Sequence, residues 1–187
     1  MAGTSKAKEP LSAAEIRQCA DLMERIPDGF IPPEIFPKWV GKFPSGPMEI
    51  IIFDEHGQVF MIPRPDGDKE YPGKPSHCPG TVQRPGETEA QAIRRAFKSG
   101  EGLNSLNVQR VIRICDADVM KGTGRGENPT RQERAVIWVG FHKGPFTGNF
   151  GGFYDPNHLP ENTLEHHRNT LIPHAIAWML LHPRVEI

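Results

Sequence analysis

The chain has 187 residues, of which 37% are hydrophobic and 24% are charged, and these values suit one globular domain with its own core. Its 22 basic and 23 acidic side chains leave a formal charge of -1, which gives no electrostatic reason to expect nucleic acid as an obligatory partner. Three scattered cysteines and no apolar run long enough to cross a bilayer predict a cytoplasmic protein without membrane contact, with buried thiols at Cys19, Cys78 and Cys115.

The N-terminal part is predicted to be an extension of the main domain. Residues 1–11 are polar and are expected to form a flexible tail. Ser12 followed by Glu15 is a capping-box pattern, and it opens a predicted helix over residues 12–26. The rest of 12–46 is dense in proline and glycine and is predicted to wrap around the domain. We expect the helix to bury one apolar stripe, whose members recur at helical spacing: Ile16, Cys19, Ala20 and Met23.

Residues 47–187 are predicted to form the main domain. Apolar runs at 48–54 and 58–64 flank a short turn with Gly57, which is typical of a β-hairpin. A Pro- and Gly-rich loop follows, and a short strand from His77 then leads into a tight loop.

The second half of this domain alternates helical and strand patterns. Residues 87–100 are predicted to form a helix, and 108–119 and 135–144 are predicted to form two more strands. The C-terminal segment has helical spacing, with Pro173 either kinking a helix or starting a second one. Together these elements predict an α/β domain.

Residues 79–103 hold the most informative pattern in the chain. Glu87, Arg95, Gly102 and Leu103 stand at fixed spacings behind a flanking turn that contains Pro79, Gly80 and Gly86. The spacing matches a signature of Gly, five residues, Glu, seven residues, Arg-Glu, an aliphatic residue, any residue, Glu-Glu, any residue, Gly and an aliphatic residue. The segment therefore resembles the signature of the Nudix family of diphosphate hydrolases.

This resemblance implies a fold and a set of structural roles. The fold is an α/β/α sandwich with a mixed central sheet, preceded here by an N-terminal helical extension. Glu87 and Arg95 are implied to form an ion pair that holds the loop against the helix. Gly86 is implied to permit the tight turn, and Gly102 to end the helix.

Four signature positions differ from the family: Thr81, Ala96, Ser99 and Gly100. Positions 96, 99 and 100 share one face of a helix, and the resemblance implies metal-binding glutamates there. Alanine, serine and glycine offer no anionic oxygen, so no metal is expected at these positions. Mg²⁺ or Mn²⁺ would bind only if its ligands have been relocated. The candidates for a relocated metal ligand or catalytic base are Glu89, Glu133 and His142.

Cationic side chains offer another way to hold phosphate. Arg84, Arg94 and Lys98 lie in or beside the helix and are candidates to bind a phosphate directly. The alternative for Arg94 and Lys98 is that they solvate an exposed helix face. Arg125 and Glu127, in a Gly-rich connection between strands, are further candidates for ligand contacts.

Three other histidines allow simpler interpretations. His77 precedes the tight loop, where it either lines a ligand pocket or meets solvent, while Cys78 is expected in the core. His166 and His167 are neighbours on a predicted helix and are expected to be solvated.

These patterns support three hypotheses. The first is a protein that binds a diphosphate-linked small molecule, such as a nucleotide derivative, with Mg-dependent hydrolysis weak or lost. The second is a hydrolase of a nucleoside diphosphate derivative that uses relocated metal or base residues. The third is a protein-interaction module, with residues 27–47 as its contact surface or as the seam of a homodimer.

Overall fold

The computed structural model describes residues 10–26, 32, 35, 46–66, 71, 76–84, 86–99, 103–121 and 131–183. Within these ranges the strands form one mixed sheet in the order β3-β2-β1-β6-β5, with β4 paired to β1 and β7 paired to β2. The elements in chain order are α1 (Ala13–Glu24), β1 (Pro47–Phe53), β2 (Val59–Pro63), β3 (Ser76–His77), β4 (Gly80–Val82), α3 (Glu89–Ser99), η1 (Leu103–Ser105), β5 (Val108–Lys121), β6 (Arg131–His142), β7 (Gly152–Tyr154), η2 (His167–Leu171) and α4 (Ile172–Leu181).

Strand β1 is the centre of the sheet. All seven of its residues are buried, and both of its faces are covered, which explains its nearly unbroken apolar sequence. It pairs in parallel with β6, from Met48 beside Val136 to Phe53 beside Phe141. The predicted hairpin with β2 is present, and Asp54 Oδ1 closes its turn by accepting the backbone N–H groups of residues 56 and 58.

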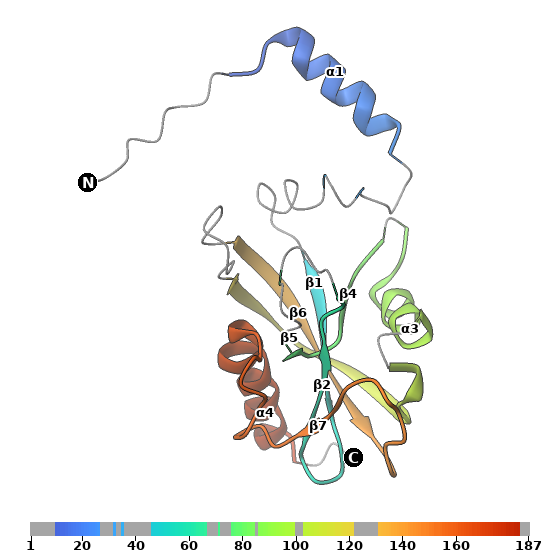
Figure 1. Ribbon diagram of the computed structural model, residues 1–187, viewed down its shortest axis with the longest axis vertical. Coiled ribbons are helices and arrows are strands. Elements are labelled where there is room, and N and C mark those ends of the chain that lie inside the picture. Colours follow the sequence, from blue (N-terminus) through green and yellow to red (C-terminus); the bar gives the residue numbers. More distant parts are fainter. Residues whose placement is uncertain are drawn as a thin grey trace, which may run out of the picture.

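Helices cover both faces of this sheet, as Figure 1 shows for α3 on one side and α4 on the other. The alternation of side chains along β1 divides the core in two. Ile51 and Phe53 belong to the cluster that contains α4. Ile50 and Ile52 belong to the cluster that contains α3. The expected α/β/α sandwich with a mixed central sheet is therefore confirmed.

Helix α1 forms as the capping box predicts. Ser12 Oγ accepts the Glu15 backbone N–H, and Glu15 Oε2 accepts the Ser12 backbone N–H at 2.8 Å. The expected burial of its apolar stripe is wrong, because α1 has no buried residue and the Ile16 side chain is 55% exposed. The spacing encodes an apolar face, but it does not encode what that face contacts. The expected wrap over residues 27–46 lies almost entirely outside the described residues.

The expectation of three buried cysteines is wrong for one of them. Cys78 is completely buried and Cys115 is partly buried, but Cys19 on α1 is exposed. Cys19 is exposed because it belongs to the apolar stripe of α1, which has no buried residue.

The C-terminal segment is helical on both sides of Pro173. A short π-helical turn, η2, runs directly into α4, and Pro173 lies in the first turn of α4. Leu171 and Ile172 keep right-handed helical backbone angles, so Pro173 follows a π-helical irregularity within one continuous helical segment. No helix in the described ranges is long and apolar enough to cross a membrane.

Candidate phosphate-binding loop and helix

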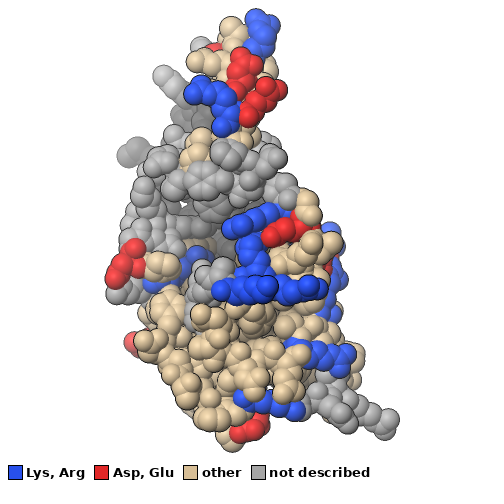
Figure 2. Space-filling view, turned by 90° about the vertical axis from the view of Figure 1, so that its right-hand side faces the viewer, with Lys and Arg blue, Asp and Glu red and all other residues tan. Residues whose placement is uncertain are grey.

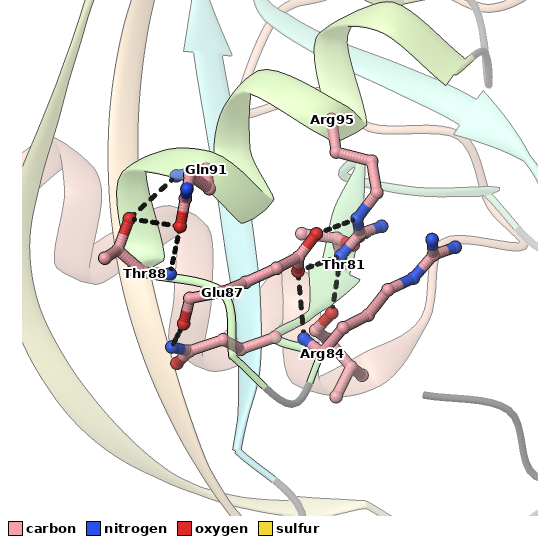
Figure 3. Close-up of polar contacts among 8 residues, drawn as sticks. Thr81, Arg84, Glu87, Thr88, Gln91 and Arg95 are labelled. Carbon is pink, nitrogen blue, oxygen red and sulfur yellow. Dashed lines mark hydrogen bonds and ion pairs between the residues drawn. The ribbon is translucent and has the colours of Figure 1, made fainter. Parts of the chain in front are cut away.

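The loop between β4 and α3 is clamped to the helix by one ion pair (Figure 3). Arg95 reaches back from the middle of α3, and its Nε and Nη2 donate to the two carboxylate oxygens of Glu87 at 2.8 and 3.0 Å. The same guanidinium donates to Thr81 Oγ1 and to the Val82 carbonyl oxygen. The fork of Arg95 therefore ties β4, the loop and the helix together, as the family resemblance implied.

The acidic partner of this clamp is also fixed by the backbone. Glu87 Oε2 accepts the Arg84 backbone N–H at 2.9 Å. The hydrogen bonds from Arg95 and then from the Arg84 backbone lower the pKa of Glu87 to about 2. Glu87 is therefore ionised, and the clamp is closed, at every pH near neutrality.

Two local features prepare the loop for this geometry. Gly86 has a φ of 77°, which only glycine adopts without strain, so its predicted role in the tight turn is confirmed. Thr88 then caps α3: its Oγ1 accepts the Gln91 backbone N–H, and Gln91 Oε1 accepts the Thr88 backbone N–H at 2.7 Å. This capping box was present in the sequence as Thr-x-x-Gln but was not predicted.

Gly80 has a role other than the expected turn. It lies within β4 opposite Glu49, and its φ is not in the left-handed range. A Cβ atom at this position would lie 2.8 Å from Glu49 Oε2 and 3.1 Å from the Met48 carbonyl oxygen. Gly80 is therefore required because the neighbouring strand approaches closely.

The helix position at which the family implies a metal ligand faces the core. Ala96 is 7% exposed and packs in the cluster of Ile50, Ile52 and Ile93. A methyl group among aliphatic side chains does not fit a divalent cation, which needs oxygen ligands. The Ser99 side chain and Gly100 lie outside the described residues, as does Gly102.

Cationic side chains lie in the loop and on the helix that the clamp joins. Arg84, Arg94 and Lys98 are all exposed, and Figure 2 shows Lys and Arg side chains gathered on the face that α3 covers. In Figure 3 the Arg84 side chain extends away from the Glu87 carboxylate, although its backbone N–H is held there. The arrangement is able to present positive charge to an anion at the end of the loop.

Of the candidates for a relocated metal ligand or base, Glu89 and His142 are not brought together. Glu89 forms an ion pair with Arg113 of β5 at 3.3 Å. His142 lies at the far end of β6, where its Nδ1 accepts the Asn107 backbone N–H at 2.9 Å. The Glu133 side chain, like Arg125 and Glu127, is outside the described residues. In the described part of the chain no three His, Cys, Asp or Glu side chains are placed to hold a metal ion.

A buried histidine cluster lies beside Cys78, against expectation. His166 and His167 are 6% and 1% exposed, so their predicted solvation is wrong. His167 Nδ1 accepts the Cys78 backbone N–H at 3.2 Å, and the His167 ring lies 5.8 Å from that of His77. His77 is 5% exposed and does not meet solvent. Its role as a ligand contact stays a prediction.

The burial of two adjacent histidines has a cause in the backbone. The Leu164 N–H donates to the Ser76 carbonyl oxygen at 2.9 Å, and the Ser76 N–H donates to the Asn162 carbonyl oxygen at 3.2 Å. These bonds hold the start of the C-terminal helical segment against β3. Contacts between residues far apart in the sequence therefore bury both histidines, although helix spacing alone predicted that they would be solvated.

Sequence reasoning also missed Glu49, a buried acidic residue in β1. Glu49 is 5% exposed. Its charge adds to the effect of burial in raising the pKa of the Cys78 thiol. The sequence feature that could have revealed it is a single charged residue inside the apolar run PMEIIIF.

Comparison with solved structures finds related folds. The MutT protein from Methanosarcina mazei Go1 aligns with a TM-score of 0.50 and 10% identity, over 71% of this chain and 94% of that chain. The NUDIX domain of Shewanella oneidensis NrtR, complexed with ADP ribose, aligns with a TM-score of 0.49 and 12% identity, over 79% and 98%. The Nudix hydrolase RenU from M. smegmatis aligns at 0.45 and 13%, over 75% and 90%. No family model and no curated protein sequence matches. At these identities the likeness concerns the fold alone.

Proposed function

We infer that this protein, whose domain has a Nudix-like fold, binds a diphosphate-linked small molecule without efficient metal-dependent hydrolysis. The observation that carries this proposal is a contrast within one helix. Arg95 keeps the loop closed through its bidentate contact with Glu87, while Ala96, the next residue, places a methyl group in the core where a metal ligand would be needed. The chain therefore keeps the ion pair that shapes the loop but lacks a metal ligand at position 96.

The cations beside the clamp support binding through side chains. Arg84, Arg94 and Lys98 are exposed, and the charge of Arg84 also helps to lower the pKa of Glu87. Guanidinium and ammonium groups bind phosphate oxygens directly through charge-assisted hydrogen bonds. A diphosphate carries more negative charge than a single phosphate, so it would gain more from several cations at one loop.

A hydrolase with relocated ligands has weaker support. Glu89 is engaged by Arg113, and His142 sits at the opposite end of β6 from the end that faces the clamp. The interaction-module hypothesis relies on residues 27–47, which lie mostly outside the described ranges. Neither alternative has a described contact that favours it over ligand binding.

Calorimetric titration tests the proposal, with ADP, ADP-ribose and UDP-glucose as probes. We expect at least one probe to bind in the absence of divalent cations, and we expect the Arg94→Gln, Lys98→Gln double variant to bind it about tenfold more weakly. The matched control is Arg25→Gln, an exposed residue just beyond α1. A parallel assay measures phosphate release and probe cleavage in Mg²⁺ and Mn²⁺. Rapid turnover of a probe, or no binding of any, would refute the proposal.

A further inference from the structure

A hollow lies at the other end of the sheet from the Glu87–Arg95 clamp. Strand β1 starts beside β4 at Pro47 and ends at Phe53, about 20 Å further along at the usual rise per residue. The hollow begins there, with a volume of about 440 Å³. Its lining comes from the hairpin turn, the end of β6, the following loop and β7: Asp54, Glu55, His56, Gln58, His142 and Phe146, among others.

His142 is the polar group at the wall of this hollow. It is 2% exposed, and its Nδ1 accepts the Asn107 backbone N–H at 2.9 Å. A ring nitrogen that accepts carries no proton, so the ring is the neutral tautomer with its hydrogen on Nε2. Nε2 is buried and has no hydrogen-bond partner among the described residues. A buried donor without an acceptor is costly, so it indicates a place where an acceptor from outside the chain would be stabilised.

Aromatic rings form the rest of that wall. The His142 ring stacks on Phe153, with centroids 5.2 Å apart and planes inclined by 28°. The Phe146 ring stands nearly perpendicular to Phe153 at 5.8 Å. Phe146 belongs to the loop between β6 and β7, and its ring also contacts Phe60 at 5.3 Å, so a ligand that reaches His142 Nε2 has to displace this ring. Flat apolar surfaces of this kind suit a planar ligand.

The rim of the hollow is acidic. Asp54 directs Oδ1 to the backbone of its own turn, where it accepts two N–H groups, and Glu55 is exposed beside it. Two carboxylates at the entrance disfavour an anionic ligand. They favour a neutral or cationic one that donates hydrogen bonds.

We propose that this hollow binds a small planar carboxamide. The carbonyl oxygen of the ligand accepts the hydrogen of His142 Nε2 once the Phe146 ring turns aside. Its amide N–H group faces the Asp54 carboxylate, and its ring lies against Phe153. This site is separate from the loop and helix that carry the proposed diphosphate binding, so each proposal stands or falls without the other.

Nuclear magnetic resonance of the full chain tests the site, with benzamide as the probe and benzoate as its anionic analogue. We expect benzamide to shift the His142 ring signals and the Asn107 amide signal at millimolar concentration. Benzoate has the same ring and an acceptor but carries a negative charge, so it should bind about tenfold more weakly. If benzamide shifts neither signal up to its solubility limit, or if benzoate binds as well, the proposal is wrong.

Substitutions separate the two polar contacts. His142→Phe keeps a ring but removes the donor, and it should weaken benzamide binding about tenfold. Because this variant also leaves the Asn107 N–H without its acceptor, Asp54→Asn serves as a second test that preserves the turn. It should narrow the preference for benzamide over benzoate to within about threefold. The matched control is Asp155→Asn, which carries the same change at a residue that also accepts a backbone N–H in its own turn but does not line this hollow. An unchanged preference in Asp54→Asn, or an equal change in the control, would overturn the assignment.

Discussion

Substituting Ala96 by glutamate restores the side chain type that the family signature has at this position. In this protein Ala96 is 7% exposed and belongs to the core cluster that holds Ile50 and Ile52 of β1 and Ile93 of its own helix. A glutamate in the same place would have to push its carboxylate into that apolar cluster or displace the helix. We therefore expect Ala96→Glu to destabilise the protein and to create no cation site.

The size of this effect follows from the packing around Ala96. Forcing a longer side chain into a packed core costs about 1–3 kcal/mol, and burying a carboxylate without partners adds at least about 2 kcal/mol. The total is roughly 3–5 kcal/mol, a large share of the ~5–15 kcal/mol that stabilises a typical domain. At about 2–4 °C per kcal/mol for a chain of this size, Tm should fall by roughly 10 °C.

Thermal unfolding monitored by circular dichroism, with and without Mg²⁺, measures the change. Arg94→Glu is the matched control, because it places the same side chain two residues earlier at an exposed position and should change stability by less than about 0.5 kcal/mol. Suppose instead that Ala96→Glu melts with the wild type and that Mg²⁺ raises its Tm. The position would then face an open cation site, and the reasoning behind the proposed function would be refuted.

Three further substitutions test single contacts. Gly80→Ala should lower the free energy of unfolding in urea by about 1–3 kcal/mol because its Cβ would meet Glu49 Oε2, whereas Gly46→Ala, with its nearest contact at 3.8 Å, should be nearly neutral. Glu87 should titrate in carbon NMR with a midpoint near 2, and a midpoint above 4.5 would contradict the clamp. Because the pKa is lowered in the folded state, the clamp's contribution to stability should be complete above pH 4.5 and lost as the pH falls toward 2. Glu87→Gln should abolish this pH dependence of stability. His167→Asn keeps an acceptor for the Cys78 N–H and should be more stable in urea than His167→Leu by about 1–3 kcal/mol, so equal stability would count against that bond.

The sequence predicted those parts of the fold that depend on local patterns. The apolar runs of β1 and β2 and the turn with Gly57 give the hairpin, because buried central strands need little more than a continuous apolar stretch. The clamp of Glu87 and Arg95 was implied by the family resemblance, and the structure contains it.

Other parts depend on contacts that no local pattern records. The burial of His166 and His167 follows from the pairing of Ser76 with residues 162–164, nearly ninety positions apart. The exposure of Ile16 and Cys19 follows from the lack of a described partner for α1. The polar wall at His142 likewise arises where the ends of β6, β7 and the hairpin turn meet.

The parallel ladder between β1 and β6 has a consequence for how the protein is made. Residues 48–53 hydrogen-bond to residues 136–141, so the central strand stays without that partner until most of the chain has left the ribosome. Pairing between such distant segments is slow, and an unpaired apolar strand is prone to associate with other chains during the delay. We therefore expect the run PMEIIIF to be the segment most in need of early cover, which its neighbour β2 supplies from the adjacent part of the chain.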